Sequence, residues 1–180
     1  MKTAEILEAA RFAARAHHGQ TRRGADDIPY VDHVLDVAAR LATVHPGDET
    51  LIVAALLHDT IEDCDVTAED IERRFGPEVS YLVQEVTDDR TLPKAARKIA
   101  QEDHVRHASD RAKRLKLADK AANVTAIART PPDWSPDRME EYVDWALRVL
   151  GPVRGLDPAL EASFDAAVTE ARAAIATRRA

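Results

Sequence analysis

The sequence predicts an all-α fold in a single domain, and three observations support this. Apolar residues recur about every 3.6 residues along almost the whole chain, and no convincing alternating strand is present. Alanine is abundant while aromatic residues make up only 4% of the chain, which suits closely packed helices. A chain of 180 residues can bury a full core without disulfides or structural metals.

The first half of the chain divides into three expected helices. Residues 3–17 form an amphipathic pattern, and the polar loop HGQTRRGADDI follows it. The loop ends at Pro29, which suits the first turn of a helix, and a second helix should run from about residue 30 to residue 43. Asp48 can cap a third helix, in which Leu51 to Leu57 is apolar on every side. We expect this third helix to be buried all round.

Caps and helix breakers also mark the second half. Thr67 with Asp70 resembles a capping box for a short helix that stops at Gly76, and Pro77 begins the next one. Ser109 can cap a long helix after a polar one. The expected helices cover residues 67–75, 77–86, 93–107, 109–129, 136–150 and 158–178, with the Pro-rich TPPDWSPD as a loop. No repeat or linker interrupts them, so one domain is expected over residues 1–180.

Composition excludes several classes of protein. The formal charge of −7 argues against general nucleic-acid binding, although local cations can still bind a small anion. The single cysteine, Cys64, excludes an internal disulfide. No apolar run reaches the roughly 18 residues of a membrane span, and the amphipathic N-terminus lacks a signal-peptide core. We expect a cytoplasmic protein without a membrane or nucleic-acid partner, and the sequence does not define its oligomeric state.

The motif HDTIED, residues 58–63, carries the first chemical signal. His58 and Asp59 follow the buried helix directly, and an imidazole beside a carboxylate can bind a divalent cation. Glu62 and Asp63 come one helical turn later and could orient and deprotonate a water molecule. The alternative for this acidic pair is a solvated loop, because further acidic residues follow it.

Two more residues could join this metal site. Asp119 falls on the apolar stripe of its long helix, where a buried carboxylate requires either a metal or a salt bridge to Lys or Arg. His33 lies at the edge of an apolar face, where a half-buried, non-ligating histidine is the alternative. Together with His58 and Asp59 they form a mixed N/O set that suits an octahedral ion such as Mn²⁺. The remaining histidines are expected at the surface: His17, His18, His45, His104 and His107.

Cations in loops and at helix starts could bind phosphate, although each one alone could equally be a solvated surface residue. They are Arg22, Arg23, Lys94, Arg97, Lys98 and Arg138. Asn123 shares a helix face with Asp119, and its amide could bond a ribose hydroxyl. These patterns indicate a metal-dependent phosphohydrolase with an anionic substrate, which they do not identify.

The ordered motifs GQTRR, PYVDH, ALLHDTIED, VTDD and KLADKAAN resemble those of the HD-domain alarmone hydrolases, the hydrolase half of Rel/Spo proteins. TLPKAARK and TPPDWSPDRMEEYVDW most resemble the small stand-alone hydrolases of the metazoan SpoT homologue type. The likeness covers residues 5–150, roughly. It implies an all-α bundle that removes the 3′-pyrophosphate of (p)ppGpp in the stringent response, giving GDP or GTP and pyrophosphate.

The resemblance also implies residue roles. One Mn²⁺ would be held by His33, His58, Asp59 and Asp119, and the catalytic pair would be Glu62 and Asp63. Arg22 matches a residue that stacks on guanine, with Arg23 beside it. Lys94 and Arg138 match phosphate contacts, and Asn123 and Tyr142 match residues around the ribose and phosphates. Ala126 stands where long multidomain members often carry Thr, so the nucleotide contact of that Thr is not expected here.

Two other functions are compatible with the sequence. HD-type proteins also include phosphohydrolases that act on other nucleotides, such as NADPH. A nucleotide with phosphate on both sides of its ribose instead suits the cations Arg22, Lys94 and Arg138. A non-catalytic alarmone-binding module is the second alternative, and the intact pair Glu62-Asp63 argues against it. A chain of this length has no room for a synthetase or regulatory domain, so we expect it only to degrade alarmones.

Overall fold

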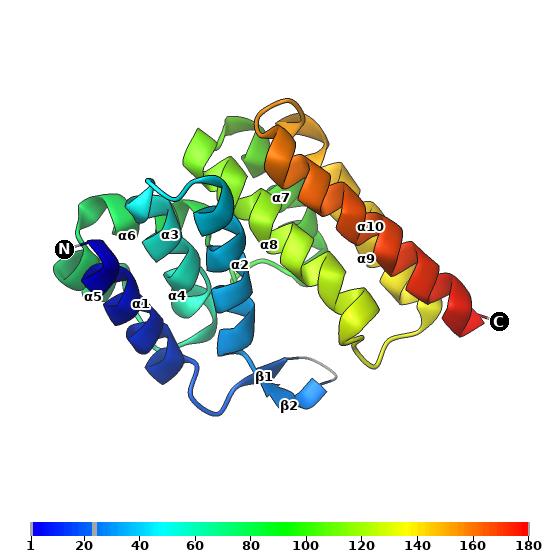
Figure 1. Cartoon of the computed structure of the whole chain (residues 1–180), viewed down its shortest axis with the longest axis horizontal. Helices are drawn as coiled ribbons and strands as arrows, with labels where there is room; N and C mark the ends of the chain where they lie inside the picture. The colour runs from blue at the N-terminus through cyan, green and yellow to red at the C-terminus, as the bar shows by residue number, and fades with distance from the viewer. Residues whose placement is uncertain (1, 23–24, 180) are drawn as a thin grey trace.

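A computed structural model describes residues 2–22 and 25–179, and helices dominate this part of the chain (Figure 1). The prediction of an all-α fold is confirmed. A two-stranded antiparallel sheet, β1 (Thr21–Arg22) and β2 (Ala25–Pro29), lies between the first two helices. The helices are α1 (Lys2–Ala16), α2 (Val31–Val44), α3 (Glu49–Leu57), α4 (Thr60–Asp63), α5 (Ala68–Phe75), α6 (Pro77–Val86), α7 (Lys94–His107), α8 (Asp110–Arg129), α9 (Pro136–Leu150) and α10 (Pro158–Arg179), with a short 3₁₀ turn at Gly151–Val153.

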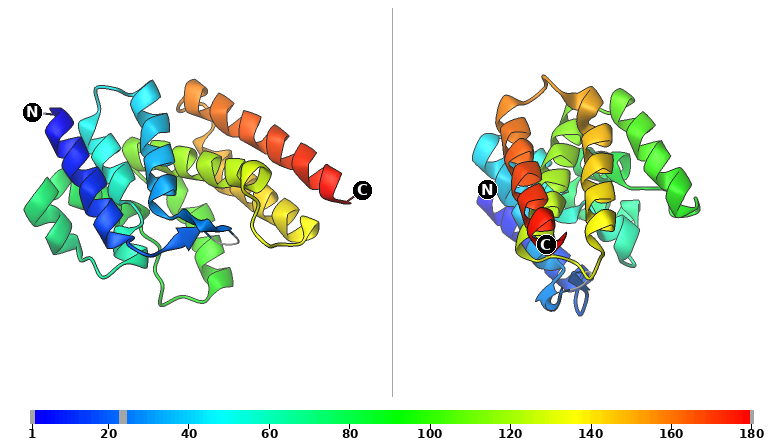
Figure 2. Two further views of the ribbon diagram at one scale, coloured as in Figure 1. Left: turned by 60° about the horizontal axis from the view of Figure 1, so that its bottom comes forward. Right: turned by 90° about the vertical axis from the view of Figure 1, so that its right-hand side faces the viewer.

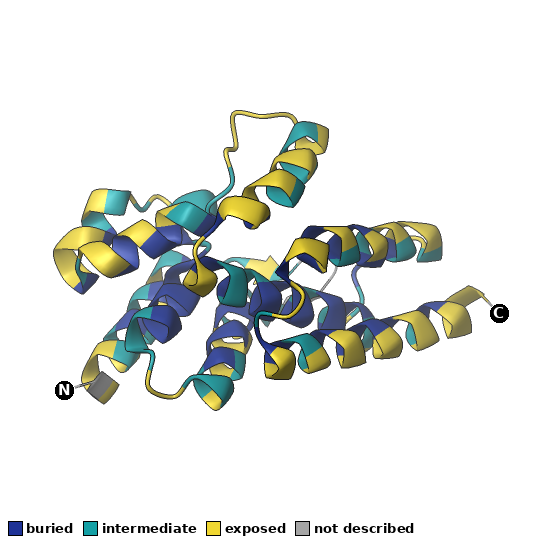
Figure 3. Ribbon diagram, turned by 90° about the horizontal axis from the view of Figure 1, so that it is seen from above, coloured by how far each residue is buried: buried dark blue, intermediate teal, exposed yellow. Residues whose placement is uncertain are grey.

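The helices form two groups that share α8. On one side α3 packs against α1, α2 and α6, and on the other α10 runs along α8 and contacts α9 (Figures 1 and 2). Buried residues gather on the facing sides of the helices, and exposed residues cover their outer sides (Figure 3). All residues from Leu51 to Leu57 are buried, as the apolar run in α3 predicts. No helix in the described part of the chain is both long and apolar enough to span a membrane.

Local caps define the helix ends near the positions expected from the sequence. The Asp48 carboxylate accepts a hydrogen bond of 3.1 Å from the backbone N–H of Leu51. Thr67 and Asp70 form the reciprocal capping box at the start of α5. Gly76 adopts a φ of +86° between α5 and α6, a conformation that favours glycine. Such caps act within one turn, so the sequence alone locates them well.

The segment between α1 and α2 differs from the expectation. Part of the polar loop forms the β1–β2 hairpin, in which Thr21 lies opposite Pro29. Pro29 therefore ends a strand, and α2 begins after Tyr30, so the expected helical position of Pro29 is wrong. The backbone N–H of Tyr30 donates to the carbonyl of Gln20 at 2.9 Å. Strands this short and polar have no apolar alternation, so the sequence pattern does not predict them.

Candidate metal centre and adjoining cavity

Four predicted residues meet where α2, α3, α4 and α8 converge. His33 lies in α2, His58 and Asp59 form the turn between α3 and α4, and Asp119 lies in α8. The Nε2 atom of His33 is 3.3 Å from Oδ1 of Asp119 and 3.6 Å from Oδ2 of Asp59. The Nε2 atom of His58 is 3.1 Å from the same Asp59 oxygen and 3.8 Å from Oδ1 of Asp119. Both imidazoles and both carboxylates therefore face one centre.

His58 provides the best evidence that a cation fits this centre. Its Nδ1 atom lies 2.8 Å from the carbonyl oxygen of Ala55, which only accepts hydrogen bonds, so Nδ1 carries a proton. Its Nε2 atom is buried, faces the carboxylates and has no hydrogen-bond partner. A carbonyl that fixes the ring in this way is the usual second partner of a ligating histidine. Two imidazole nitrogens and two carboxylate oxygens suit a divalent ion.

The charges at the centre also favour a cation. Burial would lower the pKa of His58, yet Asp59 and Asp119 raise it to about 10, so positive charge on Nε2 is stabilised there. Burial would raise the pKa of Asp119, but Lys120 and the two imidazoles hold it well below its usual range. Lys120 Nζ lies 3.1 Å from Oδ2 of Asp119, while Oδ1 faces the histidines. Asp119 therefore forms the salt bridge to a lysine that the sequence left as an alternative to metal binding. Its other oxygen, Oδ1, still faces the metal centre.

Glu62 and Asp63 are the last two residues of α4, one turn beyond Asp59. The alternative of a solvated acidic loop is wrong, because both residues are half-buried in a helical turn. Burial and the nearby carboxylates of Asp88 and Asp59 raise the pKa of Glu62. A carboxylate with a raised pKa is a better acceptor for a proton from water.

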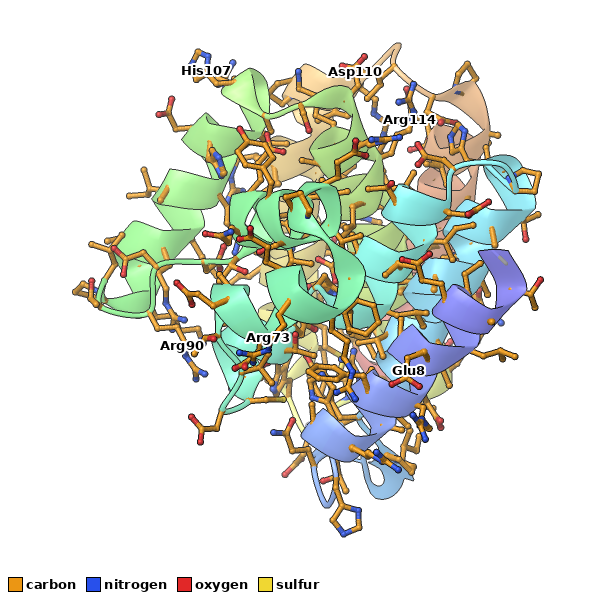
Figure 4. All side chains as sticks on the ribbon, turned by 90° about the vertical axis from the view of Figure 1, so that its left-hand side faces the viewer. Glu8, Arg73, Arg90, His107, Asp110 and Arg114 are labelled. Carbon is orange, nitrogen blue, oxygen red and sulfur yellow. The ribbon has the colours of Figure 1, made fainter. Side chains whose placement is uncertain are left out.

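Two residues that the sequence did not single out hold Asp63. Arg90 Nη1 lies 3.1 Å from Oδ1 of Asp63 and also donates to the backbone carbonyl of Glu62. Arg90 belongs to the loop between α6 and α7 and lies at the surface (Figure 4). The Tyr30 hydroxyl contacts Oδ2 of Asp63 and also reaches Asp59. Burial and these two carboxylates raise the pKa of Tyr30, so its hydroxyl stays protonated.

A cavity of about 470 Å³ opens beside the acidic pair. Predicted site residues line it: Arg22, Glu62, Asp63, Lys94, Asn123, Arg138 and Tyr142. Arg90, Arg97 and Lys98 add positive charge to its walls, and Ala126 also lines it. Arg23 lies outside the described residues. The cavity therefore combines an acidic edge near the metal centre with cationic walls that suit an anionic ligand.

Arg22 and Asn123 connect the cavity to the metal centre. Arg22 Nη2 donates to Oδ1 of Asn123 at 2.7 Å, and Nδ2 of Asn123 donates to Oδ1 of Asp119 at 2.6 Å. The Arg22 guanidinium also lies 5.5 Å from the centroid of the Tyr30 ring. The hairpin that carries Arg22 thus reaches α8, and a ligand in the cavity would meet Arg22 and Asn123 together.

The cavity also has an aromatic wall, of which the sequence predicted only Tyr142. Trp134, Tyr142 and Trp145 follow one another with ring centroids 5.8 Å and 5.4 Å apart. The Arg138 guanidinium lies 4.4 Å from the ring of Trp134, and Lys98 Nζ lies 5.0 Å from that of Trp145. Both tryptophans of this aromatic-poor chain fall between residues 134 and 145, a concentration that could have indicated the wall. Aromatic faces beside cations can stack on planar ligand groups.

The expectation that His17 is a surface residue is wrong. It is 3% exposed, its ring stacks on Tyr30 at a centroid distance of 4.7 Å, and its Nδ1 lies 2.8 Å from Oε1 of Gln20. It is buried because the chain turns back into the hairpin immediately after α1. His45 is half-buried against Asp157, whereas the other histidines expected at the surface are exposed: His18, His104 and His107.

A helical bundle with a buried His-Asp centre, an acidic pair beside it and a cationic cavity defines a metal-binding domain of the His-Asp type. The model of the HD domain family matches residues 9–144. The chain belongs to the HD domain family. HD domains bind divalent metal ions, and the cluster of His33, His58 and Asp119 agrees with this property.

Three relatives support this assignment. The MESH1 proteins of Xenopus tropicalis and Homo sapiens are 47% and 45% identical to the chain, and each match covers 89% of the chain and 90% of the relative. Both are named guanosine-3′,5′-bis(diphosphate) 3′-pyrophosphohydrolases. A solved structure described as a metazoan orthologue of SpoT that hydrolyses ppGpp matches with a TM-score of 0.87 and 40% identity, over 93% of this chain and 95% of that one.

Proposed function

We propose that this protein is a Mn²⁺-dependent guanosine-3′,5′-bis(diphosphate) 3′-pyrophosphohydrolase. It removes the 3′-pyrophosphate of (p)ppGpp and leaves GDP or GTP, which ends an alarmone signal of the stringent response. The observation that carries this proposal is the acidic pair Glu62-Asp63 between the His-Asp centre and the cationic cavity. The activities named for the MESH1 relatives support the choice of substrate.

The metal ligands in this proposal are His33, His58, Asp59 and Asp119. The unpartnered Nε2 atom of His58 and the mixed N/O donor set are the structural support. A divalent ion bound there supplies Lewis acidity towards water and phosphoryl oxygens. The hydrogen bond from Asn123 and the ion pair with Lys120 hold the Asp119 carboxylate in place.

Glu62 is the proposed general base, and Asp63 helps it to orient the attacking water. Water adds to the phosphorus attached to the ribose 3′ oxygen, the bond between that phosphorus and the 3′ oxygen breaks, and the 3′ oxygen is protonated. Glu62 accepts the proton of the water, which its raised pKa favours. Arg90 and Arg97, near the acidic pair, can neutralise charge on the departing pyrophosphate.

Residues around the cavity bind the nucleotide in this proposal. Arg22, with Arg23 beside it, contacts the guanine, and Asn123 and Tyr142 contact the ribose and phosphates. Lys94 and Arg138 bind phosphate, and Arg138 already lies against Trp134 at the aromatic wall. Arg22, Asn123, Tyr142, Lys94 and Arg138 all line the cavity, which supports these roles.

The whole chain is proposed to act as one HD-type domain, in which α10 packs along α8 behind the site. The enzyme would work in the cytoplasm on a small nucleotide and would need neither nucleic acid nor a membrane.

Pyrophosphate release from ppGpp, measured with Mn²⁺ and with a chelator, tests the proposal. We expect equal amounts of GDP and pyrophosphate with Mn²⁺ and neither product after chelation. A panel with pppGpp, NADPH, deoxynucleoside monophosphates and cyclic nucleotides defines the substrate. Faster hydrolysis of NADPH than of ppGpp would assign a different substrate to the same site, whereas tight ppGpp binding without products would indicate a binding module.

A further inference from the structure

The hydroxyl of Tyr30 joins the metal centre to the acidic pair. It donates to Oδ2 of Asp59 at 2.7 Å and lies 3.3 Å from Oδ2 of Asp63. The same Asp59 oxygen is the one that approaches Nε2 of both His33 and His58. One hydroxyl group therefore contacts both the oxygen that faces the metal centre and a carboxylate of the proposed catalytic pair.

The Tyr30 ring is held from several sides, so its hydroxyl has little freedom. His17 stacks on it with centroids 4.7 Å apart and an angle of 26° between the ring planes. His33 contacts it edge-on with centroids 5.8 Å apart, and the Arg22 guanidinium lies 5.5 Å from its centroid. The backbone N–H of Tyr30 is bonded to the carbonyl of Gln20.

Gln20 extends this support to α4. Its Nε2 atom donates to the backbone carbonyl of Asp63 at 2.9 Å, and its Oε1 atom lies 2.8 Å from Nδ1 of His17. The hairpin segment therefore contacts α4 twice, once through Gln20 at the backbone of Asp63 and once through Tyr30 at its side chain. These contacts link the acidic pair to the metal centre through side chains of the protein itself.

We propose that Tyr30 is a positioning residue that orients the Asp59 carboxylate for the metal ion and holds Asp63 at the distance that the reaction requires. The ligating oxygen of a carboxylate has a second lone pair, and a hydrogen bond to that lone pair restricts how the carboxylate turns. The Tyr30 hydroxyl has a single proton, which lies between the two carboxylates. It therefore orients Asp59 and Asp63 relative to each other, and both keep their negative charge. This inference rests on the proposed role of Asp59 as a metal ligand.

Tyr30→Phe tests this role, because the phenyl ring keeps the contacts with His17, His33 and Arg22 and removes only the hydroxyl. We expect the dissociation constant for Mn²⁺, measured by titrating the metal-free protein, to rise about 10-fold or more, as for other residues that orient metal ligands. At saturating Mn²⁺ we expect kcat for ppGpp to fall about 10-fold, with KM changed less than about twofold. Tyr81→Phe is the matched control, because Tyr81 is 67% exposed on α6 and should leave every value unchanged.

Circular dichroism and thermal unfolding show whether Tyr30→Phe folds. A folded variant whose Mn²⁺ affinity and kcat both match the Tyr81→Phe control overturns the positioning role. An equal loss of affinity for ppGpp and of kcat would also contradict it, because Tyr30 would then act in substrate binding. If the wild-type protein binds Mn²⁺ without hydrolysing ppGpp, the proposed substrate fails while the Mn²⁺ titration still tests Tyr30. If the wild-type protein binds no divalent ion, both proposals fail.

Discussion

The Nε2 atom of His58 and the Oδ1 atom of Asp119 lie 3.8 Å apart across the buried centre, one at the end of α3 and the other within α8. α3 belongs to one of the two helix groups, and α8 is the helix that both groups share. A metal ion held between them would bind the folded state only, since the unfolded chain does not bring the ligands together. Metal binding should therefore be linked to the stability of the whole bundle.

Mn²⁺ should raise the unfolding temperature of the wild-type protein. A ligand at 100 times its dissociation constant stabilises the folded state by about 2.7 kcal/mol. Asp119→Ala should lose both the bound metal and this stabilisation, measured by metal analysis and by thermal unfolding with and without Mn²⁺. Asp103→Ala, at an exposed position of α7, is the control and should behave as wild type. An Asp119→Ala protein with normal metal content would remove Asp119 from the ligand set.

Glu62→Gln should bind Mn²⁺ and ppGpp but lose turnover. The amide keeps the size of the side chain but cannot accept the proton of the attacking water, and general-base catalysis contributes about 10²–10⁴-fold to the rate. Stopped assays of pyrophosphate give kcat, and equilibrium binding gives the affinity for ppGpp. Glu72→Gln, exposed on α5, is the matched control. Near-normal kcat in the Glu62 variant would rule out the assigned role.

Arg22→Ala should weaken nucleotide binding more than it slows the chemical step. The variant loses the guanidinium at the cavity wall and its hydrogen bond to Asn123. The lost contact between the guanidinium and the nucleotide should cost about 1.5–3 kcal/mol, as a charged hydrogen bond does, so KM should rise about 10- to 100-fold. Steady-state kinetics with ppGpp measure this, and Arg106→Ala on the exposed side of α7 is the control. A fall in kcat with unchanged KM would contradict a role in substrate binding.

Asp157 should stabilise the start of α10 in a pH-dependent way. Burial would raise its pKa, but the hydrogen bond from the backbone N–H of Leu160 and the contacts with His45 and Arg114 hold it below the usual aspartate value of 3.8. A carboxylate with a lowered pKa in the folded state stabilises that state above its unfolded pKa and loses this effect as the pH falls through the folded pKa.

Asp157→Asn should therefore reduce the free energy of unfolding by about 1–3 kcal/mol at pH 5, because the charged contacts are lost. The difference from wild type should shrink as the pH falls below 3.8. Urea unfolding at several pH values measures both effects. Asp144→Asn, half-exposed in its ion pair with Arg172 on the surface, should change the free energy of unfolding much less. A constant difference between Asp157→Asn and wild type down to acid pH would show that the charge of Asp157 has no stabilising role.

Local signals predicted most of the fold. Ser109 caps α8 and Ser135 caps α9 through hydrogen bonds from N–H groups three residues later, so each helix start is encoded in a few adjacent residues. The hairpin and the burial of His17 could not be predicted in this way. Both depend on the chain turning back after α1, which brings Gln20 and Tyr30 beside residues far along the sequence.

The candidate metal site was largely predictable because its residue types are unusual in their positions. Asp119 on an apolar stripe and His58-Asp59 after a buried helix each require a partner. The supporting residues have no such signal. From the sequence, Lys120 looks like an ordinary surface lysine next to Asp119. In the structure it is only 4% exposed, and its Nζ atom lies 4.7 Å from the centroid of the Trp145 ring.

The sequence by itself determined the helices, their caps and the chemical groups available for a metal and an anionic ligand. Each of these depends on interactions within one or two turns, which adjacent residues specify. Only the tertiary structure decided that the hydroxyl of Tyr30 lies between Asp59 and Asp63, and that Arg22 reaches Asn123 above the metal centre. Those contacts form where α2, α4 and α8 pack together and the hairpin folds back against them. These segments are far apart in the sequence, so they meet only when the whole core is buried.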